Sequence, residues 1–494
     1  MKRSSGILLH ISSLPGEDGI GGMGKDAYQF IDFLAKTNQK IWQILPLGPV
    51  GYGNSPYQSY SAFAGNPIFI DIQQLVADRL ISKTLVTAQQ FKARKVEFDR
   101  VEEWKRRLFR EAYKGFQKNF DRYRQEYDHF MSHHSWWLND YALFRSLKSK
   151  TGESVWNTWD QKLVKRDNQA LQEAFGELHD EIDYHRFLQF IFFRQWFKLK
   201  AYANLKGVRI FGDVPLYVSL DSADVWANQD IFKLDEHGKP IQVGGVPPDY
   251  FSETGQLWGN PVFDWNRLAE RNFDWWLARI NFNLSMFDQV RVDHFRGLES
   301  YWSIAAKAKT AIVGEWLPAK GYELLQKLKE SRVLGSNLNI IAEDLGIITP
   351  EVEKLRDDFG LPGMKVLQFA FGSDEENTNL PHNYDSNFVV YTGTHDNDTT
   401  LGWFNSIEKA ERKVLRRYVK GNGKELVRQM MEYSWASSAM MAIAPMQDVL
   451  GLDTQSRMNT PGTATGNWDW RFSWPQLRAN HPRFLKEITK KYNR

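Results

Sequence analysis

The stretch "QVRVDHFRG" at residues 289–297 combines the pattern of a β-strand with charged residues at its end. Val290 and Val292 are β-branched and alternate with Arg291 and Asp293, as expected for a strand. An acid between two arginines is explained either by a structural ion pair or by a carboxylate that must stay ionised because it acts as a nucleophile. The rest of the chain has to distinguish these interpretations.

Seven further short runs of apolar or β-branched residues occur along the chain, and several end in polar residues. They cover residues 6–15, 40–49, 208–218, 339–346, 364–372, 388–398 and 441–451. Segments with helical periodicity, such as "GKDAYQFIDFLAKTN", lie between several of these runs. Eight strands that alternate with helices predict an α/β fold, the (β/α)8 TIM barrel. Functional residues of this fold lie at the C-terminal ends of the strands.

Two long segments interrupt the alternation. Residues 77–200 are charged and aromatic with helical spacing, which predicts a mainly helical insertion between the second and third strands. Its last part is expected to return to the barrel as the helix before strand three. Residues 219–288 are rich in Gly and Pro and predict a loop-rich insertion over the active site. Its aromatic residues, among them Trp258, argue against disorder.

The remaining residues are assigned to the barrel itself. We expect strands one and two in residues 1–76, strand three in residues 201–218, and strands four to eight with a closing segment in residues 289–494. The stretch "NTPGTATGNWDWRFSW" after strand eight is expected to close the barrel, so no separate C-terminal domain is predicted.

The composition is typical of a globular protein that binds neither nucleic acid nor membranes. Of 494 residues, 42% are hydrophobic and 25% are charged, and 63 basic and 60 acidic residues leave a formal charge of +3. Without a long basic run, nucleic-acid binding is not indicated. Aromatic residues make up 14%, with 19 Trp. Their flat faces suit sugar rings, although aromatic residues also fill large cores.

The sequence contains no cysteine, which excludes disulfides, thiolate metal sites and thiol nucleophiles. No apolar run approaches the roughly 20 residues that span a bilayer. The apolar run near the start is interrupted by His10 and is too weak for a signal sequence. We therefore expect a cytoplasmic protein.

Three carboxylates, Asp293, Glu343 and Asp396, lie toward the ends of predicted strands four, five and seven. These strand ends converge on one cleft in a barrel. Cleavage of a glycosidic bond with retention requires two carboxyl groups about 5–5.5 Å apart. One attacks the anomeric carbon, and the other protonates the departing oxygen. Arg291 would lower the pKa of Asp293, whereas burial after the apolar run "NIIA" would raise the pKa of Glu343.

Asp396 would bind sugar hydroxyls and favour the distorted, oxocarbenium-like ring, with His395 and the more distant His294 as hydroxyl partners. Taken singly, each motif has an ordinary explanation. Asp293 beside Arg291 is compatible with a structural ion pair, "GTHDND" with a polar turn, and Asp213 in "GDVPLYV" with a structural anchor. The specific signal is the ordered set, with each member on its own predicted strand end.

"VRVDHFRG", "IIAEDLG" and "YTGTHDNDT" resemble the catalytic signatures of the α-amylase clan of retaining α-glycosidases. "GDVPLYV" is similar to the first signature of that clan, from which Pro215 and Tyr217 depart. Four longer stretches resemble the 4-α-glucanotransferase, or amylomaltase, branch. They are "GILLHISSLPG", "WQILPLGPVGYGNSPYQSYSAFAGNP", "GGVPPDYFSETGQLWGNP" and "NTPGTATGNWDWRF". The resemblance runs from about residue 6 to residue 475, which is nearly the whole chain.

The resemblance implies roles for individual residues. Asp293 would be the nucleophile that forms a covalent glucosyl-enzyme, Glu343 the acid/base and Asp396 the transition-state stabiliser. Arg291 would orient the nucleophile, Tyr57 would stack on the sugar, and Asn467 would close the cleft. Tyr52 would be a more remote glucan contact. The other substrate-site residues implied by the resemblance, or by the aromatic content of the loop, are His395, His294 and Asp213, and in the loop Asp249, Tyr250, Gln256 and Trp258.

Many α-amylases bind structural calcium, but this branch is not known for needing it. No acidic cluster with the spacing of a calcium loop occurs in the sequence, so we expect neither a metal nor another cofactor.

Three functions are compatible with these residues. The first is a 4-α-glucanotransferase that moves a segment of an α-1,4-glucan donor to the 4-hydroxyl of an acceptor, either glucose or a maltooligosaccharide. The second is a hydrolase of the same clan, in which water is the acceptor. The third is an inactive glucan-binding protein, against which the three intact carboxylates argue. An aromatic loop over the barrel mouth favours transfer, because it would shelter the intermediate from water.

Overall fold

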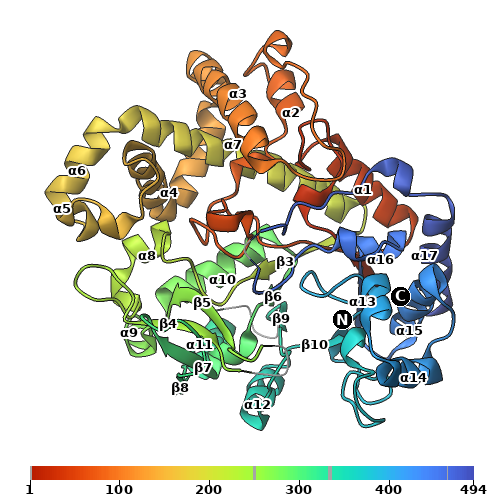
Figure 1. Cartoon of the computed structure of the whole chain (residues 1–494). Helices are drawn as coiled ribbons and strands as arrows, with labels where there is room; N and C mark the ends of the chain where they lie inside the picture. Colours follow the sequence, from red (N-terminus) through yellow and green to blue (C-terminus); the bar gives the residue numbers. More distant parts are fainter. Residues whose placement is uncertain (1–2, 249–251, 332–336, 464) are drawn as a thin grey trace.

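Eight parallel strands form the barrel at the centre of the computed structural model, which describes all residues except 1–2, 249–251, 332–336 and 464 (Figure 1). Hydrogen bonds order the strands β10–β11–β12–β1–β2–β3–β6–β9. The strands are β1 (Ser4–Leu8), β2 (Ile41–Gln43), β3 (Arg209–Val214), β6 (Gln289–Val292), β9 (Ile340–Ala342), β10 (Gly363–Val366), β11 (Phe388–Tyr391) and β12 (Met441–Pro445). The Ala342 N–H donates to the Pro362 carbonyl at 2.8 Å and so connects the two ends of this sheet. The predicted (β/α)8 barrel is confirmed.

The strands are apolar because helices cover the outer face of the sheet and side chains fill its interior. Every residue of β1, β2, β6, β9 and β12 is buried. Strands buried on both faces read as nearly continuous apolar runs. Asp213 and Arg291 are exceptions, with only 2% and 3% of their surface exposed. Buried charges require partners, and Asp213 and Arg291 pair with each other.

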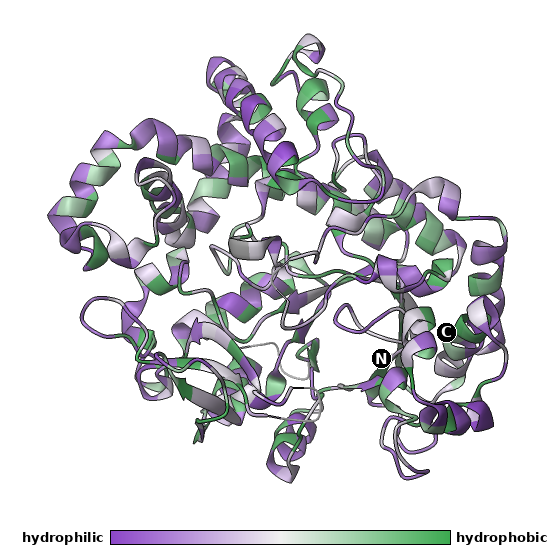
Figure 2. Cartoon of the chain, in the orientation of Figure 1, coloured by the Kyte–Doolittle hydropathy of each residue, from purple (hydrophilic) through white to green (hydrophobic). Residues whose placement is uncertain are grey.

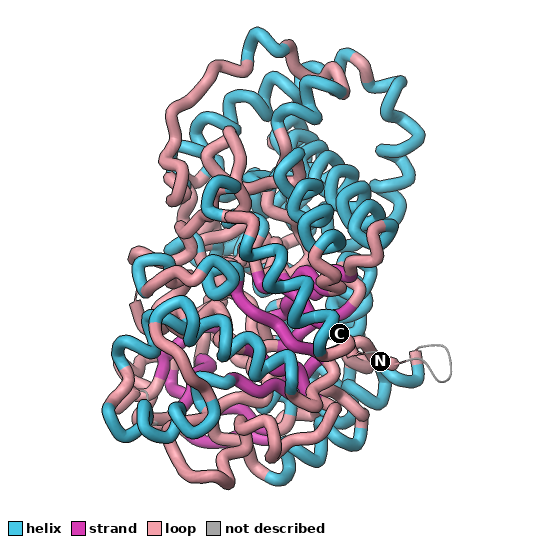
Figure 3. Tube along the Cα trace, turned by 90° about the vertical axis from the view of Figure 1, so that its right-hand side faces the viewer, coloured by secondary structure: helices cyan, strands magenta, loops and turns pink. Residues whose placement is uncertain are grey.

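Helices surround the barrel on its outside, and Figure 3 shows the strands enclosed between them. Helix α1 shows the reason: Ala27, Phe30, Ile31 and Leu34 recur at helical spacing and are all buried. Figure 2 shows the same mixture of hydrophobic and hydrophilic positions along the other helices. The surrounding helices are α1 (Lys25–Lys36), α10 (Asp274–Met286), α11 (Gly321–Glu330), α12 (Pro350–Asp358), α13 (Thr400–Ser406), α14 (Lys409–Tyr418), α15 (Gly423–Ala436), α16 (Met446–Leu450) and α17 (Asn480–Lys491).

The chain between β2 and β3 is mainly helical. The long helices α4 and α7 pack against each other, and α7 also contacts β3, which follows it. The indole N–H of Trp196 on α7 donates to the Met286 carbonyl at 3.2 Å, which attaches this helix to the barrel wall. The helices of this region are α2 (Ile72–Ala77), α3 (Phe98–Lys118), α4 (Phe120–Lys150), α5 (Gln161–Val164), α6 (Asn168–Glu177) and α7 (His179–Leu205).

Residues 219–288 contain more regular structure than the predicted loop-rich insertion. They form α8 (Ala223–Ala227), β4 (Gln242–Val246), β5 (Gln256–Pro261), α9 (Trp265–Glu270) and α10. β4 and β5 join β7 (Ser300–Ala305) and β8 (Glu315–Pro318) in an antiparallel sheet of order β5–β4–β7–β8. This sheet therefore extends beyond residue 288, where the predicted segment ended. Among the described residues, no helix is long and apolar enough to cross a membrane.

Candidate active site

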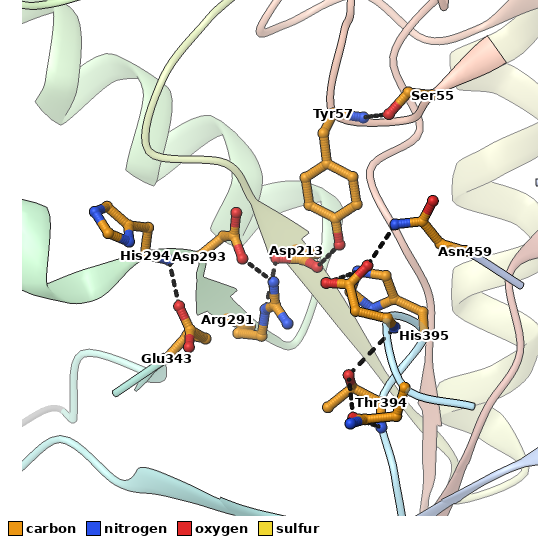
Figure 4. Close-up of polar contacts among 12 residues, drawn as sticks. Ser55, Tyr57, Asp213, Arg291, Asp293, His294, Glu343, Thr394, His395 and Asn459 are labelled. Atoms are coloured by element: carbon orange, nitrogen blue, oxygen red, sulfur yellow. Dashed lines mark hydrogen bonds and ion pairs between the residues drawn. The ribbon is translucent and has the colours of Figure 1, made fainter. Parts of the chain in front are cut away.

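The register of neighbouring strands brings the predicted site residues together at one end of the barrel. Asp213 on β3 is paired with Arg291 on β6, and Val292 on β6 is paired with Ala342 on β9. Asp293 and Glu343, the next residues on these two strands, therefore leave the barrel side by side (Figure 4). This arrangement follows from the parallel sheet, in which the carboxyl ends of all strands lie at the same edge.

Arg291 connects two carboxylates. Its Nε donates to Asp213 Oδ1 at 3.1 Å, and its Nη2 donates to Asp293 Oδ1. Tyr57 Oη donates to the other oxygen of Asp213, Oδ2, at 2.6 Å. Burial alone would lower the pKa of Arg291, but the charges of Asp213 and Asp293 raise that pKa well above its usual value. Arg291 is therefore a permanent cation, and Asp213 anchors both this cation and the Tyr57 hydroxyl.

The pKa of Asp293 lies above its usual range, which corrects one expectation from the sequence. Burial raises the pKa of Asp293, Arg291 lowers it, and Asp213 and Asp396 raise it again, to about 6 in total. The predicted direction of the Arg291 effect is correct, but burial and the neighbouring negative charges outweigh it. Asp293 keeps 30% of its side chain exposed. It is therefore accessible, and it is ionised above about pH 6.

Glu343 stays protonated to a higher pH than Asp293 does. The His294 N–H donates to Glu343 Oε2 at 2.7 Å, and the Leu345 N–H donates to Oε1 at 3.0 Å. Both bonds favour the ionised form, but burial, followed by the negative charge of Asp293, raises the pKa of Glu343 to about 8. The direction predicted from the sequence is thus correct, and the neighbouring carboxylate adds to the effect of burial.

Asp396 is held in the ionised state by side chains on both of its oxygens. His395 Nε2 lies 3.3 Å from Asp396 Oδ2, and Asn459 Nδ2 donates to Oδ1 at 2.6 Å. Burial would raise the pKa of Asp396, but His395, Asn459 and Arg291 together lower it below its usual range. Its side chain is 45% exposed, so this carboxylate remains accessible to a ligand.

An aromatic group lies beside these carboxylates. The Tyr57 ring stacks on the His395 ring, with a centroid distance of 5.3 Å and an angle of 15° between the planes. The Trp468 ring lies 5.9 Å from each of them. Tyr57 and Asp213 also line a pocket beside β3, and His395 lines a second one at the ends of β1 and β12. Tyr57, His395 and Trp468 therefore meet, although they are far apart in the sequence.

On the other side of Asp293, the β5 strand supplies Gln256 and Trp258. Trp258 packs edge-on against His294, with ring centroids 4.8 Å apart, and its indole N–H donates to Gln256 Oε1 at 3.1 Å. His294 has a left-handed backbone, with φ of 51°, which is uncommon outside glycine. Burial and Arg296 lower the pKa of His294 to about 3, so the ring is neutral.

Another predicted site residue, Asn467, makes its side-chain hydrogen bonds within its own loop. The side-chain amide of Asn467 accepts from the Thr460 N–H at 2.9 Å and donates to the Thr463 carbonyl at 2.9 Å, so it braces its own loop. Tyr52 begins the 3₁₀ turn Tyr52–Asn54. Asp249 and Tyr250 lie outside the described residues.

Asn459 and Trp468 belong to the group around Asp396 and His395 but were not predicted as site residues from the sequence. Both residues lie in the quoted stretch "NTPGTATGNWDWRF", of which Asn459 is the first residue, and nothing in the local pattern distinguishes Asn459 from a turn residue. Among the residues described, no group of three or more His, Asp or Glu side chains is arranged to hold a metal ion.

This geometry can support acid and nucleophilic chemistry at one bond. Asp293 loses its proton near pH 6, whereas its neighbour Glu343 keeps a proton to about pH 8. Two adjacent carboxyl groups with separated pKa values are the arrangement by which retaining glycosidases attack and protonate a glycosidic bond.

A family model described as 4-alpha-glucanotransferase matches residues 9–477. The chain belongs to this family. A 4-alpha-glucanotransferase from Synechocystis sp. is 49% identical over 99% of the chain and 98% of its own length. One from Thermus thermophilus is 46% identical over the same shares of the two chains. The resemblance to the 4-alpha-glucanotransferase family predicted from the motifs is therefore confirmed.

Solved structures agree with the membership in the 4-alpha-glucanotransferase family. The amylomaltase from Streptococcus agalactiae in complex with acarbose has a TM-score of 0.96 and 41% identity, and the match covers 100% of both chains. The barrel and the segments around it are therefore shared along the whole chain.

Proposed function

We propose that the chain transfers a segment of an α-1,4-glucan to the 4-hydroxyl of glucose or of a maltooligosaccharide, through a covalent glycosyl-enzyme. The observation that carries this proposal is the pair Asp293 and Glu343 on adjacent strands, one with a pKa of about 6 and the other of about 8. Near neutral pH the first is a carboxylate and the second an acid. Membership in the 4-alpha-glucanotransferase family supports the choice of substrate.

In the first step, Asp293 Oδ attacks the anomeric carbon of the donor glucose, and the bond from that carbon to the departing O4 breaks. Glu343 gives its proton to this O4, so the shortened chain leaves as an alcohol. Arg291 holds Oδ1 of Asp293, which leaves Oδ2 available for this attack.

In the second step, the 4-hydroxyl of an acceptor sugar attacks the same anomeric carbon from the side that the leaving chain vacated. Glu343, now a carboxylate, takes the hydroxyl proton while the bond to Asp293 breaks. The enzyme regains its starting protonation states. Two inversions give net retention of the α-configuration.

The other residues around this pair would bind the sugar. The Tyr57 ring, fixed by Asp213 and by stacking on His395, would lie against the donor glucose. Asp396 and His395 would bind its hydroxyls, and the ionised Asp396 would stabilise positive charge on the ring in the transition state. Gln256 and Trp258 would contact the acceptor. A cytoplasmic location stays a prediction from the sequence.

Incubation of the purified protein with maltotriose tests the proposal. Transfer produces a ladder of longer and shorter oligomers together with glucose on a thin-layer plate, and the number of reducing ends stays constant. Accumulation of only maltose and glucose, with new reducing ends, would instead identify a hydrolase. An absence of any product would support the inactive glucan-binding alternative.

A further inference from the structure

Asp396 receives hydrogen-bond donors from two segments of the chain. His395 belongs to the same loop as Asp396, whereas Asn459 lies 63 residues further along the sequence. The amide of Asn459 donates to Asp396 Oδ1 at 2.6 Å, which is a short distance for an N–H donor. Asn459 therefore makes the close contact that fixes one oxygen of this carboxylate (Figure 4).

The segment around Asn459 is itself fastened to the loop that carries Asp396. The Asn459 N–H donates to the His395 carbonyl at 3.2 Å. The Arg457 guanidinium joins two carbonyls, with Nη2 donating to that of Asp396 at 2.6 Å and Nε to that of Asn459 at 2.7 Å. The Trp468 N–H donates to the Met458 carbonyl at 2.8 Å on the other side. The Asn459 amide therefore has a defined position relative to Asp396.

We propose that Asn459 is a positioning residue for Asp396, whose amide N–H holds this carboxylate in one orientation and in its ionised form during glycosyl transfer. The inference rests on the proposed function, in which Asp396 stabilises the charged transition state. An amide suits this role because it donates a hydrogen bond without carrying a charge or titrating. A carboxylate with half of its surface exposed would otherwise rotate between orientations, and small misplacements of a catalytic group are costly.

The charged groups around Asp396 make an aspartate in place of Asn459 a test of this role. The charged and titratable groups that face Asp396 come from its own loop, from β6 and the residue after it, from the loop after β2 and from the segment around Asn459. They are His395, Arg291, Asp293, Tyr57 and Arg457. An aspartate in place of Asn459 would have nearly the same shape. At low pH it would carry a proton and could donate to Asp396, but at high pH the two carboxylates would repel each other.

The experiment measures kcat and KM for maltotriose transfer from about pH 5 to about pH 9 in wild type, Asn459→Ala and Asn459→Asp. Asn459→Ala is expected to lose roughly ten- to a hundredfold in kcat at every pH, with KM nearly unchanged. Asn459→Asp is expected to come closest to wild type at low pH and to lose activity relative to wild type progressively as the pH rises. Asn459→Ala should instead keep the same alkaline limb as wild type, which reflects the ionisation of Glu343.

A matched control exists at the opposite end of the barrel. Asn204 Nδ2 donates to Asp288 Oδ2 at 2.9 Å, and Asp288 directly precedes β6. Asn204→Asp therefore creates the same kind of carboxylate pair far from the site, and we expect it to keep the shape of the wild-type pH profile.

The outcomes separate this inference from the proposed function. A wild type that makes no oligomer ladder refutes the proposed function. If the wild type makes the ladder, two results overturn the positioning role alone. One is a pH profile of Asn459→Asp that is parallel to the wild-type profile, and the other is a full wild-type kcat in Asn459→Ala. Thermal unfolding of each variant identifies loss of fold. If Asn459→Asp does not fold, Asn459→Ala alone tests the positioning role, which predicts a lower kcat with KM nearly unchanged.

Discussion

Asp293 lies between two arginines in the sequence, but only one of them acts on it. Arg291 donates to its carboxylate, whereas Arg296 donates to the Ile347 carbonyl and lies over the Trp316 ring at 3.7 Å. The two explanations offered by the sequence, an ion pair and a nucleophile, are therefore compatible. Arg291 partly offsets the burial and the negative charges that would otherwise keep Asp293 protonated at neutral pH.

Removal of this cation should be visible in the pH dependence of activity. Arg291→Ala should raise the pKa of Asp293, because Arg291 has the largest effect of the groups that lower this pKa, while burial, Asp213 and Asp396 still raise it. Since Asp293 attacks as a carboxylate, the acidic limb of the kcat/KM profile should move to higher pH. Arg291→Lys keeps the charge and should leave the limb near its wild-type position, while kcat falls because the two-pronged geometry is lost. An unmoved limb in Arg291→Ala with intact activity would favour a purely structural ion pair.

The acid role of Glu343 predicts trapping of the intermediate. Glu343→Gln cannot protonate a departing sugar, but α-glucosyl fluoride has a leaving group that needs little acid assistance. A covalent adduct should therefore accumulate on the variant and appear by mass spectrometry on a peptide that contains Asp293. The double variant with Asp293→Asn is the control and should form no adduct. An adduct on Asp396 or Asp213 would contradict the assignment of the nucleophile.

The sequence was informative about the catalytic residues at strand ends and uninformative about their hydrogen-bond partners. Asp293, Glu343 and Asp396 each follow a recognisable strand, so their convergence could be predicted from the barrel. The net pKa of Asp293 could not, because it depends on the burial of the folded site. Nor could Asn459, because its contact with Asp396 joins two loops that become neighbours only after the barrel closes.

Among the elements, β5 connects the antiparallel sheet to the active site. Gln256 and Trp258 face the barrel mouth, whereas Leu257 points to the opposite face, with 39% of its surface exposed. This alternation explains how one short strand carries both acceptor-side residues. Trp258 also supports His294, so its contribution includes packing as well as contact with substrate.

Trp258→Ala should therefore reduce transfer without abolishing the chemistry. We expect a loss of roughly ten- to a hundredfold, equivalent to about 1.5–3 kcal/mol of lost acceptor binding, and a higher ratio of hydrolysis to transfer because water competes better. Release of reducing ends compared with release of glucose from maltotriose measures this ratio. Leu257→Ala on the same strand is the matched control and should keep the wild-type ratio. Equal loss in both reactions of Trp258→Ala would show that the residue supports only the fold or the donor side.

The barrel strands were predictable and the antiparallel sheet was not, for a physical reason. The barrel strands are apolar runs bounded by turns and alternate with amphipathic helices. By contrast, "QVGGV" and "QLWGNP" contain glycine and proline, which indicate turns. Their pairing depends on close approach: a Cβ on Gly244 would lie 2.4 Å from the Tyr217 ring, so only glycine fits there. A local pattern does not report such a constraint.

Ionisation of Glu343 in the active site should lower the free energy of unfolding of the protein at alkaline pH. Glu343 has a pKa of about 8 in the folded chain, against a usual value of 4.5. It therefore binds its proton more tightly when folded, and its contribution to the free energy of unfolding falls as the pH rises from the lower value to the higher one. Above about pH 8 the folded protein carries the full cost of a buried charge.

Glu343→Gln removes this titration. We expect the Tm of the variant, relative to that of wild type, to increase steadily between about pH 4.5 and about pH 8 and to level off beyond. Any penalty from placing an amide against the His294 and Leu345 N–H groups is independent of pH and shifts only the offset. Thermal unfolding followed by circular dichroism at a series of pH values measures the difference. A constant difference across this range would show that Glu343 has the same pKa in both states.

The pairing of β1 with β12 also determines when the barrel can close during folding in a cell. Ser4 pairs with Met441, and Leu8 with Pro445, so the first barrel strand waits for its neighbour until the last barrel strand has been made. At about 5–20 residues per second, the nascent chain would expose this apolar edge for roughly 20–90 s. Barrel closure therefore follows the synthesis of β12, and the waiting edge of β1 is the surface on which we expect chaperones to act and misassembly to begin.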